Sequence, residues 1–168
     1  PLWSSTELNS LILLLPYSPQ KSTLSKKLEG LRHLKVTEMD LSNLTSYLNF
    51  QGLMTLSYEL FSVIENPAKV HMGFIPVFQN SPNLRELSIF SYHPPFEGAM
   101  SIIKEFVHHL FLLPNLVRAN IGFFQMPLTP NQLKELAQSL PFTSSLKTFT
   151  LGFKSGQIFR DIDSCYKL

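Results

Sequence analysis

The residues best suited to metal chemistry in this 168-residue chain are its five histidines. His108 and His109 are adjacent, so in a helix their side chains point about 100° apart, whereas helical metal sites place ligands at positions i and i+4. His33 and His93 each stand alone in the sequence. Because a zinc site needs three or four ligands, we expect no metal site. We also expect no other cofactor.

The remaining candidates for chemistry are one thiol and one pair of carboxylates. Cys165 has no catalytic sequence context, and the chain contains no Gly-x-Ser-x-Gly motif and no glycine-rich phosphate loop. Asp161 and Asp163 would face the same way in a strand, but a solvated terminal segment is the favoured interpretation. We therefore predict that the chain is not an enzyme and has no small-molecule substrate.

Composition and charge exclude several classes of protein. Apolar residues make up 44% of the chain and charged residues only 15%, which is typical of a folded domain with a real core. The net charge of +2 comes from basic and acidic residues that are mixed along the sequence, so we expect no nucleic-acid partner. No apolar run approaches the ~18 residues of a membrane span, so we expect no membrane insertion. A single cysteine excludes a disulfide framework and favours the cytoplasm.

The most informative feature is a repeated apolar pattern. The template Leu-x-x-Leu-x-Leu, with related apolar residues at its last two positions, begins at residues 8, 31, 53, 84, 116 and 146. Successive starts are separated by 23, 22, 31, 32 and 30 residues. Near-even periods of this size indicate a repeat array, in which each unit buries its apolar face against its neighbours. We predict one domain over residues 1–168, and we expect it to belong to a longer protein.

Each unit is predicted to contain a strand, and the later units a helix as well. The alternation after each leading leucine, the first residue of the template, is typical of a half-buried strand. Residues 96–112 carry an apolar stripe at helical spacing, formed by Met100, Ile103, Val107 and Leu110. A strand followed by a returning helix makes the next strand parallel, because such crossovers are right-handed. The fold class we predict is α/β.

The segment 130–140 is the best-marked helix in the sequence. Thr129 is a good N-cap, Pro130 fits the first helical position, and Gln132 completes a capping-box pattern. One face is predicted to be apolar, formed by Leu133, Leu136, Ala137 and Leu140. Pro141 then ends the helix.

Three segments carry a resemblance to a known family. They read SPNLRELSIF (81–90), LPNLVRANIGF (113–123) and LTPNQLKELAQSLPFTSSLKTFTLGF (128–153). These segments resemble leucine-rich repeats of the ribonuclease-inhibitor-like type, and they are most similar to the C-terminal repeats of NLR-type innate immune sensors. The resemblance implies a solenoid with a parallel sheet on its concave side and helices on its convex side. It also implies non-catalytic recognition of another protein, as the ligand-sensing or autoregulatory part of a sensor.

Other functions remain open within the same repeat class. F-box proteins with leucine-rich repeats are the second resemblance, and they imply a substrate receptor of a ubiquitin ligase. GTPase activators of the Ran type also resemble this class, but that family is far more acidic. A structural subunit of a large assembly is a further alternative.

One departure from the family concerns the eighth residue after each leading leucine, which is usually Asn or Cys. Here this position holds Pro16, Met39, Phe61, Tyr92, Phe124 and Lys154. We therefore expect no polar ladder at this position, and the units are divergent. The aromatic residues near the strand ends are expected to fill the core, with a binding patch as the alternative.

The repeat predicts which side chains line the concave sheet face, the surface that solenoids use for binding. The outward strand positions are Ser10, Ile12, Leu14, His33, Lys35, Thr37, Thr55, Ser57, Glu59, Glu86, Ser88, Phe90, Arg118, Asn120, Gly122, Thr148, Thr150 and Gly152. The candidate partner-binding residues among them are Glu86, Ser88, Phe90, Arg118, Asn120, Thr148 and Thr150. A solvated sheet face without a partner is the alternative interpretation.

Overall fold

The computed structural model describes residues 9–13, 30–37, 48–60, 67–92, 98–124, 128–140 and 145–154. Within these residues the chain forms a six-stranded parallel sheet and three helices, so the α/β prediction is confirmed. The strands are β1 (Ser10–Leu13), β2 (His33–Thr37), β3 (Thr55–Leu60), β4 (Glu86–Tyr92), β5 (Arg118–Phe124) and β6 (Thr148–Lys154). The helices are α2 (Pro67–Gln79), α3 (Ala99–Phe111) and α4 (Pro130–Ser139).

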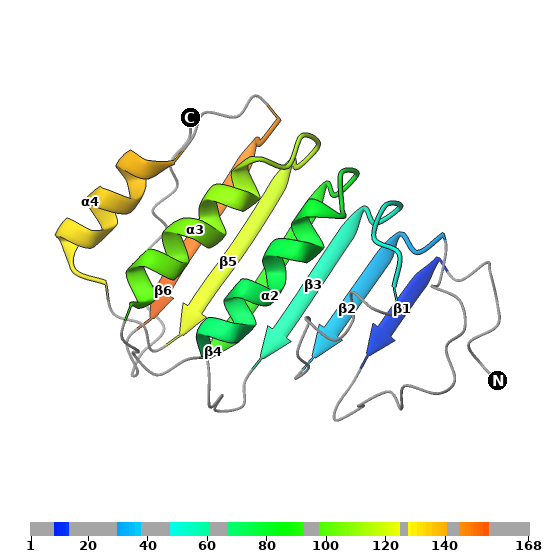
Figure 1. Cartoon of the computed structure of the whole chain (residues 1–168), viewed down its shortest axis with the longest axis horizontal. Coiled ribbons are helices and arrows are strands. Elements are labelled where there is room, and N and C mark those ends of the chain that lie inside the picture. Colours follow the sequence, from blue (N-terminus) through cyan, green and yellow to red (C-terminus); the bar gives the residue numbers. More distant parts are fainter. Residues whose placement is uncertain are drawn as a thin grey trace.

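The strands lie side by side in chain order, from β1 to β6. Helix α2 connects β3 to β4, α3 connects β4 to β5, and α4 connects β5 to β6. Figure 1 shows α2 and α3 lying across one face of the sheet and α4 lying next to α3 at the β6 end. Each helix therefore returns the chain to the edge at which the next parallel strand begins.

The strand register follows the repeated template unit by unit. The second apolar position of every template falls in one row across the sheet, formed by Leu11, Leu34, Leu56, Leu87, Ala119 and Phe149. The third position forms a second row, made by Leu13, Val36, Tyr58, Ile89, Ile121 and Leu151. The second and third template positions of the six units are thus structurally equivalent, while the first leading leucine, Leu8, lies outside the described residues.

The same backbone junction joins each unit to the next. The carbonyl oxygen of the residue after a leading leucine accepts hydrogen bonds from two consecutive N–H groups of the following unit, at 2.8–3.1 Å. Five carbonyls do so, those of Asn9, Arg32, Met54, Arg85 and Val117. Because the junction is the same for units of about 22 and of about 31 residues, the longer helical connections do not disturb the sheet.

Side-chain ties between units occur at a position that the sequence pattern did not single out. The residue before the leading leucine is Asn83 in one unit and Asn115 in the next. Asn83 Nδ2 donates to the Gln51 carbonyl at 2.7 Å, and Asn115 Nδ2 donates to the Pro82 carbonyl at 2.9 Å. These two amides each satisfy a loop carbonyl of the preceding unit. The eighth position after the leading leucine, by contrast, ends β4, β5 and β6, where Tyr92 pairs with Phe124 in register. Pro16, Met39 and Phe61 at this position lie outside the described residues.

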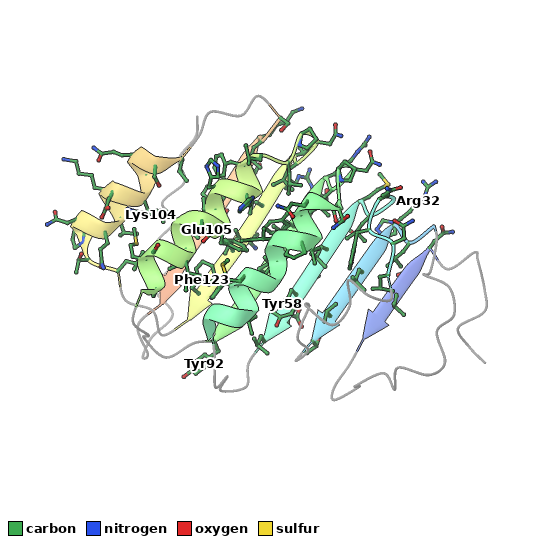
Figure 2. The ribbon with its side chains drawn as sticks, viewed as in Figure 1. Arg32, Tyr58, Tyr92, Lys104, Glu105 and Phe123 are labelled. Carbon is green, nitrogen blue, oxygen red and sulfur yellow. The ribbon has the colours of Figure 1, made fainter. Side chains whose placement is uncertain are left out.

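An aromatic cluster fills the space between the helices and the sheet. Phe106 of α3 lies against Phe74 and Phe78 of α2, with ring centroids 5.5 and 5.4 Å apart. Tyr58 and Phe123, both fully buried, extend the cluster from β3 and β5 (Figure 2). The edge-to-face geometry of most of these pairs is the arrangement that aromatic quadrupoles favour.

Helix α3 buries most of the stripe expected of it. Ile103, Val107 and Leu110 are buried, and Met100 is half-buried. Its N-terminus begins after Gly98, whose φ of 77° is a left-handed conformation that favours glycine. No side chain caps this end of the helix, and the Gly98 carbonyl accepts the first intrahelical hydrogen bond, from the Ile102 N–H group.

Helix α4 has the predicted capping box but is less buried than predicted. The Thr129 hydroxyl accepts from the Gln132 N–H group, and the Gln132 side chain accepts from the Thr129 N–H group. Of its expected apolar face only Leu136 is buried, whereas Leu133 is 42% exposed. The reason is its place at the β6 end, where α3 is the only described element that contacts it. Within the described part of the chain, no helix is both long enough and apolar enough to cross a membrane.

Candidate functional site

The sheet surface opposite the helices, called the open face below, is built from the outward positions predicted from the repeat. Strand register places these side chains in straight rows across all six strands. One row contains Ser10, His33, Thr55, Glu86, Arg118 and Thr148, and the next contains Ile12, Lys35, Ser57, Ser88, Asn120 and Thr150. Alternation along each strand explains this, because successive side chains point to opposite faces. Leu14 lies outside the described residues.

A hollow of about 400 Å³ lies on the open face over β3 to β6. Six of the seven candidate residues line it, namely Glu86, Ser88, Arg118, Asn120, Thr148 and Thr150. Phe90 is not among the lining residues, because it lies further along β4, in register with Glu59 and Gly122. The structure thus brings six candidate side chains into one depression and leaves the seventh beside it.

Two outward-facing side chains that line the hollow were missed among the candidates. Thr55 and Ser57 of β3 occupy the same two rows as Glu86 and Ser88 of β4. The signal that could have found them is the template itself, since they stand at equivalent positions. The predicted candidates all belong to the last three units, whereas Thr55 and Ser57 belong to the unit before them.

The charges of the open face are paired across neighbouring strands. Lys35 Nζ lies 2.9 Å from Glu59 Oε1, and one guanidinium nitrogen of Arg118 lies 3.2 Å from Glu86 Oε1. Each pair joins a cation to an anion on the adjacent strand, so the four groups sum to zero. Because the Glu86 and Arg118 side chains are 52% and 69% exposed, solvent screens their attraction. The ion pair therefore holds the Glu86 and Arg118 side chains near each other only weakly.

The hollow also presents uncharged hydrogen-bonding groups. Within the described residues, the side chains of Ser88, Asn120, Thr148 and Thr150 form no hydrogen bond with the protein. Their hydroxyl and amide groups can both donate and accept. The arrangement suits a polypeptide, whose backbone also offers donors and acceptors in alternation.

The aromatic residues near the strand ends divide between the two faces of the sheet. Phe123 is buried among the helices, as expected of a core residue. Phe90 and Tyr92 are half-buried on β4, and Phe90 belongs to an outward row. Core filling is therefore confirmed for Phe123, while Phe90 lies at the edge of the surface that holds the hollow. The side chain of Phe124 and all of Phe96 lie outside the described residues.

The described residues contain no cluster of three His, Cys, Asp or Glu side chains that could hold a metal ion. His33 Nδ1 lies 2.7 Å from the Thr55 hydroxyl on the open face. His108 and His109 lie on α3, with ring centroids 5.9 Å apart. Asp161, Asp163, Cys165 and His93 lie outside the described residues.

Comparison with known proteins assigns no family or function to this chain. No protein-family model, no curated protein and no solved structure matches the chain.

Proposed function

We propose that the chain is a leucine-rich repeat solenoid that recognises another protein with its open face, which would be the concave side. The observation that carries the proposal is the hollow over β3 to β6, whose lining includes four polar side chains, those of Ser88, Asn120, Thr148 and Thr150, that form no hydrogen bond within the described residues. The repeated junction and the strictly sequential parallel sheet support the repeat architecture. Solenoids present such sheet faces to protein partners.

The chemistry of the hollow supports recognition rather than catalysis. Its outward-facing side chains are hydroxyls, one amide and one exposed ion pair, and its remaining lining residues are Leu56, Leu87 and Ala119. The hydroxyls and the amide can bind a polar polypeptide surface through many modest hydrogen bonds. A partner would also desolvate the Glu86–Arg118 pair, so its own polar groups would have to satisfy both charges. This requirement gives the surface its specificity.

We further propose that the parent protein is a cytoplasmic sensor of the NLR type. The support is the phrase Pro-Asn-Leu followed by the template, which occurs at Leu84 and again at Leu116. The two units that carry it are those whose asparagine amides tie each unit to the preceding one. A nucleotide-binding segment in the full-length protein would be expected for this class.

The test is comparative capture with the full-length protein from its native source, followed by mass spectrometry. The hollow variant is Arg118→Ala with Thr150→Ala, and the matched control is Lys134→Ala with Gln138→Ala on the exposed surface of α4. Both variants truncate exposed side chains, so both should retain the wild-type circular dichroism spectrum. We expect a protein that is recovered with the wild type and the control to be lost with the hollow variant.

Two results would contradict the proposal. One is a partner that is recovered equally with all three proteins. The other is a partner that is lost only with the α4 variant, which would place recognition on the helical layer.

A further inference from the structure

The structure aligns basic residues that are scattered in the sequence. The residue after each leading leucine lies at the sheet edge where the strands begin, since these residues share the repeated backbone junction. Immediately before β2, β4 and β6 this residue is Arg32, Arg85 and Lys147, and all three are exposed. We call these three residues the basic edge. Figure 2 shows Arg32 extending from this edge, away from the sheet.

The basic edge is not neutralised by the described part of the chain. Within the described residues, none of its three side chains forms an ion pair or a hydrogen bond. The acidic side chains of the sheet are engaged elsewhere, because Glu59 pairs with Lys35 and Glu86 pairs with Arg118. The basic edge therefore has a net positive charge, whereas the paired charges of the open face cancel.

The spacing of the three cations indicates the shape and charge of a ligand that would fit the basic edge. Neighbouring strands lie about 4.8 Å apart, so cations on alternate strands recur about every 10 Å and span about 20 Å from β2 to β6. Between them, the equivalent positions immediately before β3 and β5 hold Met54 and Val117, which are half-buried. A complementary ligand is extended, carries several anionic groups and lies along the edge next to the hollow.

The chemistry of the edge favours carboxylates on a polypeptide over a nucleic acid. Single-stranded nucleic acids are held by basic grooves together with aromatic platforms. The aromatic residues of the sheet's outer surface, Phe90 and Tyr92, lie toward the opposite ends of the strands (Figure 2 labels Tyr92). We propose that the basic edge binds an acidic segment of the protein partner that occupies the hollow. This inference rests on the proposed function and specifies the partner's chemistry.

The probe is a fluorescently labelled peptide of about ten residues in which Glu alternates with Ser, long enough at about 3.4 Å per residue to span the edge. The reference peptide carries Gln in place of Glu. The edge variant is Arg85→Gln with Lys147→Gln. The control variant, Lys104→Gln with Lys134→Gln, removes the same charge from the helical layer. All proteins are used as the full chain.

We expect the Glu peptide to bind the wild type and the control variant, and the edge variant to bind it at least about threefold more weakly. The Gln peptide should not bind. Raising the salt concentration from about 50 to about 300 mM should weaken the wild-type complex, because exposed charges are screened. A thermal melt of the edge variant that matches the wild type shows that the fold is intact.

Three results would overturn the inference: equal weakening by the edge and control variants, no binding of the Glu peptide at low salt, or tighter binding of a single-stranded oligonucleotide or of anionic vesicles than of the Glu peptide. These failures are distinguishable from failure of the proposed function. If the edge variant still captures the partner that the hollow variant loses, recognition by the hollow stands and the acidic segment is excluded.

Discussion

Phe106 lies at the centre of the aromatic cluster, so its truncation tests how the helices are held on the sheet. The side chain is 1% exposed, and its ring centroid lies 5.4–6.0 Å from the rings of Phe74, Phe78, His71 and Phe123. These neighbours come from α2 and β5, whereas Phe106 belongs to α3. The substitution therefore removes contacts between three separate elements.

The cost of each substitution follows from the lost contacts. Phe106→Ala should lower the free energy of unfolding by about 3–5 kcal/mol, the range found when a buried phenylalanine leaves a cavity. Phe106→Leu keeps most of the buried apolar surface but loses the ring contacts. Each such contact is worth about 0.5–1.5 kcal/mol and the contributions do not fully add, so the expected cost is about 1–3 kcal/mol.

The assay is urea denaturation followed by far-ultraviolet circular dichroism. Leu112→Ala at the end of α3 is the matched control, because that side chain is 59% exposed and its truncation should cost less than about 1 kcal/mol. We expect Phe106→Ala to be the most destabilised, Phe106→Leu to be intermediate and Leu112→Ala to be the least destabilised. A Phe106→Ala protein no less stable than the Leu112→Ala protein would refute the reasoning.

Three further predictions concern single interactions. Thr129→Ala removes the hydroxyl that caps α4 and should cost about 1 kcal/mol in chemical denaturation, whereas Thr129→Ser should cost less. Gly98→Ala should cost about 1–2 kcal/mol, although its side chain would meet no atom within 4 Å, because φ is 77°. A double-mutant cycle on Glu86 and Arg118 should give a coupling below about 1 kcal/mol that falls with added salt, because both side chains are exposed.

The α/β fold could be predicted from the repeated template because the template contains two kinds of structural information. Its apolar positions specify which side of each strand is buried, and its period specifies which residues lie in register. Leu84 and Leu116 illustrate this, since both are buried and the strands that follow them pair in the predicted register. Where the pattern was weakest, at Ala119 and Tyr58, the register still holds, because the neighbouring strands impose it.

Two structural features could not be read from the same pattern. The sequence predicts an apolar face on α4, but whether that face is buried depends on its neighbours, and among the described elements only α3 contacts this helix. The alignment of Arg32, Arg85 and Lys147 was also missed. Their charges lie 53 and 62 positions apart in the sequence, and only the strand register makes them neighbours on one edge.

The candidate site was predictable in its positions but not in its shape. Alternation along each strand identified the outward side chains, including Arg118 and Thr150. That six of them line a hollow while Phe90 lies beside it depends on the dimensions of neighbouring side chains, which no periodicity encodes. The pairing of Glu86 with Arg118 likewise required the register of β4 and β5.

The most direct test of recognition by the open face is site-specific photo-crosslinking in the native source. A photoreactive residue replaces Thr150 in the hollow in one protein and Leu133 on the helical layer in another, both exposed positions. We predict that the Thr150 position crosslinks a discrete protein partner and that the Leu133 position does not. A partner that crosslinks only from Leu133, or none from Thr150 while the protein remains folded, would contradict the account.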